Sequence, residues 1–272
     1  MKTILASIVA IGLFIGCQTV PISGRRQLAI VSNAELFPLS FQSYQGVLDT
    51  SRVIRGNTQA EMVQRVGNRL RQAMESYMNA NGFGDRLAGY QWQFSLIESP
   101  EVNAWCMPGG KVAFYTGILP YTQNEAGAAA VMGHEISHAI AEHGRERMSE
   151  GLLANGLIQT GQTFAGSKAQ SNTSATKAIL YQAVGVALPV AYQVGRALPH
   201  SRAQESEADK LGLVFMAMAG YNPNEAISFW GRMAQAGGGN KPPEFLSTHP
   251  SDQRRIDDLK KLLPEAMKYY KG

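Results

Sequence analysis

The 272-residue sequence predicts an α+β fold that is mostly helical and contains a small β-sheet. Residues between Tyr90 and Leu96 alternate between apolar and polar side chains, which is typical of a β-strand. From residue 122 onwards, apolar residues recur mostly at the spacing of α-helices. The apolar fraction of 44% excludes wholesale disorder, and the length is sufficient for one large domain or two small ones.

Composition also excludes several kinds of protein. The net charge is only +4 and no run of Lys or Arg occurs, so no nucleic-acid partner is expected. Two cysteines exclude a disulfide scaffold and a zinc site made of cysteines alone. All five histidines lie between His134 and His249, so histidine-based chemistry is confined to the second half of the chain.

The first 16 residues are typical of a secretory signal peptide. The apolar run from Thr3 to Gly16 is shorter than the ~20 residues that span a bilayer. The four residues from Phe14 to Cys17 resemble the lipobox of bacterial lipoproteins, which implies cleavage before Cys17 and a lipid anchor on it. The Asp that favours inner-membrane retention in such lipoproteins is replaced by Gln18, which favours the outer membrane. The alternatives are an ordinary signal peptide and a buried N-terminal helix.

We expect residues 17–57 to form a tether and an N-terminal helical segment, followed by a domain over residues 58–272. That domain begins with a helix over residues 59–79. Thr58 and Glu61 form a capping-box pattern there, and apolar residues follow at helical spacing.

After the strand near residues 90–96, a second short strand is expected at Lys111–Tyr115, following a glycine-rich turn at residues 108–110. A helix over about residues 123–143 then begins at a second capping-box pattern and ends at Gly144.

The C-terminal half is predicted to be mostly helical. The expected segments are a helix at 145–160, a loop at 161–176, a buried or hairpin helix at 178–198, and helices starting at Ser201, at Asn222-Pro223 and after Pro250. The apolar segment at 178–198 contains Pro189 and three polar residues, which argues against a membrane span.

Residues 134–138 read His-Glu-Ile-Ser-His within a predicted helix, which is the HExxH pattern. Because four residues are slightly more than one helical turn, the imidazoles of His134 and His138 point to one side and can hold adjacent positions around Zn2+. Glu135 lies near the same face and can act as general base on a metal-bound water. The alternative, a surface helix with two incidental histidines, is weakened by apolar residues on both sides.

A catalytic zinc usually has three protein ligands, and the spacing alone leaves the third one open. His143 lies about 140° around the helix from the two histidines, so we expect it at the helix end and not at the metal. Glu205 and Asp209 share one helical face, where Glu205 could bind zinc and Asp209 could hydrogen-bond a ligand histidine. Glu207, between them, points elsewhere. A solvated acidic face is the alternative.

HExxH followed by Ser-Arg-x-x-Glu-x-x-Ala-Asp at residues 201–209 closely resembles the M48 family of zinc metalloendopeptidases. The similarity covers about residues 100–260 and points to bacterial lipoprotein and periplasmic members, which are related to a mitochondrial inner-membrane stress protease. It also includes these residues: Asn103-Ala104-Trp105, Pro108-Gly109-Gly110, Gly133, His143-Gly144, Thr248-His249-Pro250 and Arg254.

The resemblance implies a zincin-like fold with one Zn2+ per chain, bound by His134, His138 and Glu205. It also implies that Glu135 is the general base and that Asp209 has a supporting or proton-donating role.

In zincins an edge strand beside the metal pairs with the backbone of a peptide substrate. By resemblance, the strand at residues 111–115 takes that place, and the glycines of the turn let a peptide approach closely. A plain hairpin turn is the alternative. The expected substrate-binding residues are Pro108, Gly109, Gly110, Lys111 and Val112.

Three roles are open for His249. In related proteins the matching histidine can lie over the zinc and fill its open position as a gate. Alternatively, His249 or Arg254 assists the oxyanion of the tetrahedral intermediate. The third role is a structural one, at the start of the last helix.

These observations predict a zinc-dependent metalloendopeptidase of the bacterial cell envelope. It would be anchored by lipid on Cys17, face the periplasm and lie in the outer membrane. Its expected substrates are polypeptides, by resemblance misfolded or unassembled envelope proteins. The alternative is an envelope chaperone or assembly factor with gated or minor proteolysis, whose partner would be the envelope assembly machinery. A non-catalytic scaffold is disfavoured because it has no need for Glu135.

Overall fold

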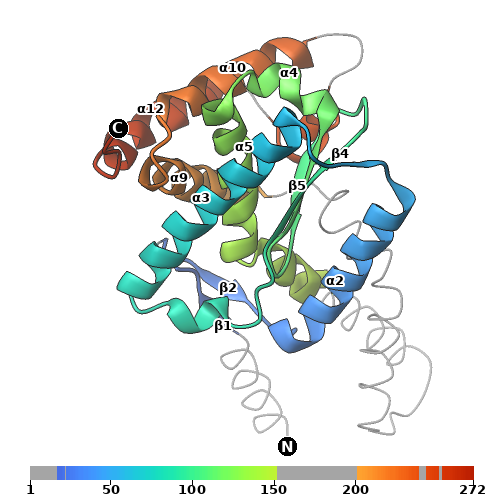
Figure 1. Ribbon diagram of the computed structural model, residues 1–272. Helices are drawn as coiled ribbons and strands as arrows, with labels where there is room; N and C mark the ends of the chain where they lie inside the picture. The colour runs from blue at the N-terminus through green and yellow to red at the C-terminus, as the bar shows by residue number, and fades with distance from the viewer. Residues whose placement is uncertain (1–16, 22, 152–200, 239–242, 251–252) are drawn as a thin grey trace, which may run out of the picture.

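The computed structural model describes residues 17–21, 23–151, 201–238, 243–250 and 253–272 (Figure 1). Within them the fold is the predicted α+β arrangement, mostly helical with a small mixed sheet and a separate two-stranded hairpin. The signal peptide expected at 1–16, the loop at 161–176 and the apolar helix at 178–198 lie outside the described residues. No described helix is both long and apolar enough to cross a membrane.

The four-stranded sheet has the order β3 (Val53–Ile54), β4 (Gln93–Ile97), β6 (Lys111–Tyr115) and β5 (Ala104–Met107). β4 and β6 are parallel, and the other two pairs are antiparallel. The strand predicted at residues 111–115 is confirmed. The other predicted strand begins later than expected, at Gln93; before it, the Gln91 N–H donates to the Gly109 carbonyl oxygen in the turn.

The expectation that Lys111–Tyr115 is an edge strand is wrong. β6 is paired on both sides, with β4 and with β5, so its backbone has no free edge for a peptide. The outer strand is β5. The sequence did not reveal β5 because all four of its residues are buried and show no alternation.

Helix α5 (Glu125–Ile140) carries the HExxH residues through the middle of the molecule, between the sheet and α9 (Arg202–Met218) (Figure 1). The two helices approach backbone to backbone, since a Cβ on Gly212 would lie only 3.0 Å from the backbone nitrogen of His134. This close approach brings the acidic residues of α9 against the histidines of α5.

Further described elements are α3 (Thr58–Ala80), η1 (Gly84–Leu87), η2 (Thr116–Ile118), α4 (Leu119–Thr122), α10 (Asn224–Gly237), α11 (Phe245–Thr248) and α12 (Gln253–Met267). Residues 143–151 are also helical, and the rest of the helix predicted at 145–160 lies outside the described residues. Helix α3 confirms the helix predicted over residues 59–79. Its N-cap is Asn57, whose side chain accepts from the Ala60 N–H at 2.8 Å, and not the expected Thr58.

The N-terminal segment differs from the expected tether. β1 (Cys17–Thr19) and β2 (Arg26–Leu28) form an antiparallel hairpin, followed by the expected helix, α2 (Asn33–Thr50). Between the strands, Arg25 pairs with Glu146 at 2.6 Å and with Glu207 at 2.9 Å. Because the same segment also supplies β3 to the main sheet, it is part of one folded body with α5 and α9.

Candidate metal centre

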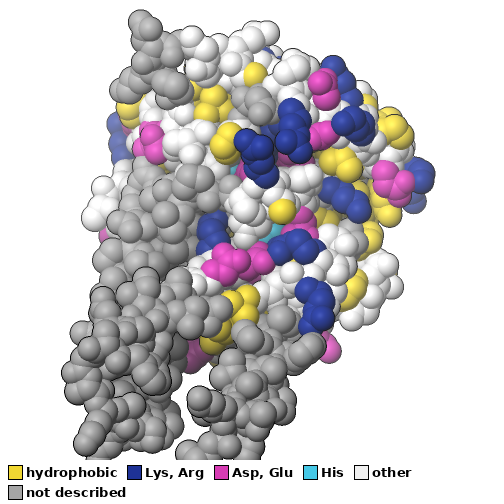
Figure 2. Space-filling view, turned by 180° about the vertical axis from the view of Figure 1, so that it is seen from behind, with side chains coloured by type: hydrophobic (Ala, Val, Ile, Leu, Met, Phe, Trp, Pro, Cys, Tyr) yellow, Lys and Arg dark blue, Asp and Glu magenta, His cyan; other side chains and the backbone are white. Residues whose placement is uncertain are grey.

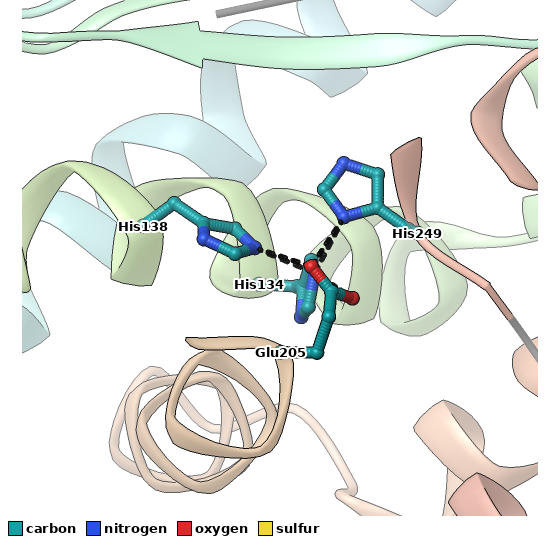
Figure 3. Close-up of side chains that lie close together, drawn as sticks. All are labelled: His134, His138, Glu205 and His249. Atoms are coloured by element: carbon teal, nitrogen blue, oxygen red, sulfur yellow. Dashed lines mark hydrogen bonds and ion pairs between the residues drawn. The ribbon is translucent and has the colours of Figure 1, made fainter. Parts of the chain in front are cut away.

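Four buried side chains from three parts of the chain converge on one point (Figure 3). His134 and His138 come from α5, Glu205 from the first turn of α9, and His249 from the residue that follows α11. One ligand atom from each lies within 4.8 Å of the others. The structure therefore brings together the three predicted ligands and the histidine whose role was open.

The spacing of these atoms fits a zinc ion. His134 Nε2 lies 3.0 Å from His138 Nε2 and 3.5 Å from Glu205 Oε2. His138 Nε2 lies 3.3 Å from Glu205 Oε1. Zinc–ligand bonds of about 2.0–2.1 Å arranged as a tetrahedron put neighbouring ligand atoms about 3.3 Å apart. Since two imidazoles and a carboxylate are also a ligand set of catalytic zinc, the residues present fit this ion.

The charges of the cluster are set by its buried neighbours. Burial alone would lower the pKa of His134, but hydrogen bonds with Asp209 and Glu205 raise it to about 9 in the metal-free protein. Burial opposes the ionised form of Glu205, yet the charges of His249 and Arg255 hold its pKa well below the usual range. Glu205 is therefore an ionised carboxylate that can bind a cation.

Asp209 holds the outer nitrogen of His134, in the position expected from the sequence. His134 Nδ1 lies 3.0 Å from Asp209 Oδ1, which turns Nε2 towards the cluster. The buried guanidinium of Arg255 lies 2.7 Å from Asp209 Oδ1 and 2.8 Å from Glu205 Oε2. It also stacks 3.4 Å from the ring centroid of Trp230. One buried arginine thus pairs with two carboxylates of the site.

Arg254, which was expected at the site, points away from it. Its side chain is 72% exposed and lies 3.7 Å from Asp258. Neighbouring residues on a helix point about 100° apart, so only one of two adjacent arginines can face the cluster. The docking of α12 selects Arg255.

Glu135 is buried beside the cluster, on the side of β5. Its Oε1 lies 3.3 Å from His249 Nε2, and its carboxylate accepts a hydrogen bond from the backbone N–H of Cys106. Burial raises the pKa of Glu135 despite the opposing charges of His249 and His134. A carboxylate whose pKa is raised towards neutrality is suited to take up and release a proton.

His249 is held against the cluster by its own short segment. Its Nδ1 lies 3.0 Å from Glu205 Oε1 and 3.2 Å from His134 Nε2. Its backbone N–H donates to the Phe245 carbonyl oxygen, and the Phe245 N–H donates to the Val102 carbonyl oxygen, both at 3.0 Å. The segment therefore covers the cluster and the start of β5. Only a small area of histidine is seen in Figure 2, between acidic and basic side chains.

The turn before β6 is closed by aromatic side chains of the chain itself. A Cβ on Gly109 would lie 2.5 Å from the Phe41 ring, and a Cβ on Gly110 would lie 2.6 Å from the Trp92 ring. Both glycines also have positive φ angles, 82° and 88°, which explains their presence without a ligand. The two glycines therefore have a structural reason, and β6 has no free edge for a peptide, whereas Pro108 lines a pocket together with Glu135 and His138. A substrate-binding role for the turn stays a prediction.

Two residues that were not expected at the metal, His143 and Glu207, lie in series behind the ligand His138. His143 Nδ1 lies 2.7 Å from His138 Nδ1, and His143 Nε2 lies 2.8 Å from Glu207 Oε2. His143 is outside the cluster of ligands, as expected, but its contact with His138 was not expected: α5 ends at Ile140, Glu142 adopts a φ of 56°, and a new helical segment starts at residue 143. The sign available in the sequence was Gly144, which marked a helix end nearby.

The sequence model of Peptidase family M48 matches residues 64–263. The protein named mitochondrial metalloendopeptidase OMA1 is 35% identical over 191 residues in Saccharomyces cerevisiae and 30% identical over 271 residues in Schizosaccharomyces pombe. These alignments cover 68% and 93% of this chain. A Vibrio cholerae protein named putative beta-barrel assembly-enhancing protease is 31% identical over 169 residues, or 61% of this chain.

The chain corresponds to only part of these relatives. It spans 50% of the Saccharomyces cerevisiae protein, 68% of the Schizosaccharomyces pombe protein and 33% of the Vibrio cholerae protein.

Proposed function

The chain belongs to peptidase family M48, and from this premise we propose that it is a zinc-dependent metalloendopeptidase. The observation that carries the proposal is the buried cluster of His134, His138 and Glu205 with Glu135 beside it. Burying ionisable groups costs free energy unless they are paired or bind a metal. A protein used only as a scaffold has no reason to keep a further buried carboxylate next to a complete ligand set.

Each side chain has a separate task in the proposed mechanism. His134, His138 and Glu205 hold one zinc ion per chain. When bound, the ion would supply Lewis-acid polarisation of the scissile carbonyl and of the attacking water. Glu135 takes the proton from that water and later delivers it to the leaving amine. Asp209 accepts the Nδ1 proton of His134, which leaves the Nε2 lone pair free for the ion.

We also propose that a peptide substrate pairs with β5, the outer strand. The Asn103 carbonyl oxygen faces β6, where it accepts from the Tyr115 N–H at 3.1 Å. Backbone groups alternate in direction along a strand, so those of Ala104 and Cys106 face away from the sheet. The contact of the Cys106 N–H with Glu135 agrees with this direction. A peptide paired there would place its backbone beside the general base.

For His249 the proposed role is a gate. Its Nδ1 lies within 3.0–3.2 Å of atoms of Glu205 and His134, where a fourth zinc ligand would be. Neutral imidazole is a good zinc ligand, so His249 in this position would exclude the attacking water. Cleavage then requires the segment that carries His249 to move.

The proposed location is the bacterial cell envelope, facing the periplasm, with a signal peptide at residues 1–16 and an outer-membrane lipid anchor on Cys17. The lipobox-like residues and the name of the Vibrio cholerae relative support this location. The proposed substrates are misfolded or unassembled envelope proteins. Radiolabelled palmitate should enter the wild-type protein and not the Cys17→Ser variant; labelling of both variants would refute the anchor.

An envelope assembly factor with gated or minor proteolysis is the second candidate. The position of His249 favours it, since a closed site needs a partner or substrate to open it. The two candidate functions predict different outcomes for cells that carry only the Glu135→Gln variant. Such cells should keep the envelope function if assembly is the main role and lose it if proteolysis is.

The test of the enzyme compares Glu135→Gln with wild type for zinc content and casein cleavage. We expect one zinc per chain in both proteins and a ~10²-fold or larger loss of cleavage in the variant. Glu125→Gln is the matched control, since Glu125 lies on the same helix and pairs with Arg65 at the surface. Near-wild-type cleavage by Glu135→Gln would remove Glu135 from the mechanism.

A further inference from the structure

A chain of polar side chains behind the ligand His138 takes no part in the mechanism above. His138 Nδ1 lies 2.7 Å from His143 Nδ1, and His143 Nε2 lies 2.8 Å from Glu207 Oε2. The same carboxylate oxygen accepts from the Nε–H of Arg25 at 2.9 Å. His143 and Glu207 are both buried, while Arg25 belongs to the N-terminal hairpin.

The hydrogen positions in the series His138–His143–Glu207 follow from which atoms can accept a hydrogen bond. An ionised Glu207 can only accept, so His143 donates from Nε2. A neutral His143 then has an acceptor at Nδ1, and the short contact requires His138 to donate from its own Nδ1. The Nε2 lone pair of His138 is thereby directed at the cluster. This tautomer is the one that binds a metal through Nε2.

The other ligand histidine, His134, is supported in a similar way but without an intervening residue. Asp209 holds His134 directly and is fixed by Arg255. Two residues earlier on α9, Glu207 holds His138 through His143 and is fixed by a different arginine. Each ligand histidine is thus supported by a carboxylate of α9 that pairs with an arginine from a distant segment.

Arg25 is itself firmly placed. Its two terminal nitrogens lie 2.6 Å and 2.8 Å from the carboxylate oxygens of Glu146, which also accepts from Gln204 Nε2 at 2.7 Å. The planar guanidinium therefore pairs with two carboxylates at once. This geometry fixes Glu207 and docks the hairpin next to the metal centre.

We propose that His143 is a positioning residue for the ligand His138, and that Arg25, acting through Glu207, makes the N-terminal hairpin part of the support of the metal centre. The proposal rests on the proposed function, because it requires a metal at His138. Residues of this kind, which hold the far side of a metal ligand, typically contribute a factor of 10–100 to metal affinity.

The test measures zinc affinity of the full chain by competition with a chromogenic chelator, using zinc alone, together with thermal unfolding of the metal-free protein. His143→Leu should bind zinc about 10–100-fold more weakly than wild type. In His143→Gln, the amide oxygen can accept from His138 and the amide nitrogen can donate to Glu207, so most of the affinity should return. Arg25→Gln should show a smaller loss in the same direction.

Tyr90→Phe is the matched control. It removes a partly buried hydrogen bond of 2.9 Å to the carbonyl oxygen of Ala139, the residue after His138, and leaves His143, Glu207 and Arg25 unchanged. Its zinc affinity should equal that of wild type even if its unfolding temperature falls.

Wild-type zinc affinity in a folded His143→Leu variant would overturn the proposal. Equal losses in His143→Leu and His143→Gln would also overturn it, because they would reduce His143 to a packing residue. If the leucine variant does not fold, Arg25→Gln decides: weakened zinc binding supports the proposal, and unchanged binding overturns it. A wild-type chain that binds no zinc would instead refute the proposed function, and this inference with it.

Discussion

Replacing Arg255 with Met should destabilise the metal-free protein far more than the zinc-loaded protein. The guanidinium is 7% exposed and lies within 2.8 Å of both Asp209 and Glu205. Methionine preserves much of the apolar contact with Trp230, but it leaves two buried carboxylates without their arginine. In the metal-free protein the histidines of the cluster and the charge of Arg147, which acts on Glu205, remain to balance them.

The expected size follows from the burial of the pair. Removing one partner of a buried ion pair costs about 3–5 kcal/mol, because the remaining charge is left uncompensated. For a chain of this length, 1 kcal/mol corresponds to a shift of ~2–4 °C in unfolding temperature, so the decrease should be roughly 6–20 °C. Zinc supplies positive charge to Glu205, so the penalty in the loaded protein should be clearly smaller.

The assay is thermal unfolding followed by circular dichroism, with chelator and then with excess zinc. Arg254→Met is the control, because that neighbouring side chain is 72% exposed and should change stability by less than about 0.5 kcal/mol. Arg255→Lys should be intermediate, since one ammonium cannot reproduce the paired contacts of a guanidinium. Equal unfolding temperatures for the two methionine variants in chelator would refute the reasoning.

Three further predictions test other parts of the molecule. Gly212→Ala should cost about 1–3 kcal/mol and weaken zinc binding, because its Cβ would meet the backbone of α5; Gly231→Ala, with open space, should cost little in the same unfolding assay. Burial opposes the ionised form of Glu146, but pairing with Arg25 lowers its pKa below the usual value. The free energy of unfolding of wild type should therefore exceed that of Arg25→Gln above pH 4.5, and the difference should disappear as the pH falls below that value, as measured by urea titration. His249→Ala should raise basal casein cleavage at equal zinc loading if it is a gate, and a ~10²-fold drop would indicate the oxyanion role instead.

The parts of the site that lie on one helix could be predicted from the sequence. The spacing of His134 and His138 fixes their common face whatever surrounds the helix. The same holds for Glu205 and Asp209, which the structure places on the ligand side and behind His134. Local geometry determines these relations, so a single sequence contains them.

Relations between segments could not be predicted in the same way. Whether Arg254 or Arg255 faces the cluster depends on how α12 packs against the rest of the protein, and the sequence of two adjacent arginines does not indicate which one does. The outer strand was misassigned because the uniformly buried residues of β5 gave no strand pattern, so the sequence did not show that β6 is paired on both sides. The contact of His143 with His138 could not be predicted from an ideal helix, because it depends on the end of α5 at Ile140 and on the positive φ of Glu142.

The segment that carries His249 occupies the place where the proposed substrate strand would begin. Its Phe245 is fully buried, stacks on Trp230 with ring centroids 5.5 Å apart, and donates its N–H to the Val102 carbonyl oxygen beside β5. Exposing a phenylalanine costs about 1.5–3 kcal/mol, and giving up one hydrogen bond costs about 0.5–1.5 kcal/mol. A gate held by these contacts would be open in roughly one molecule in 30 to one in 2,000. A peptide that replaces the Phe245 N–H at the edge of β5 recovers part of that free energy, so substrate binding itself can open the site.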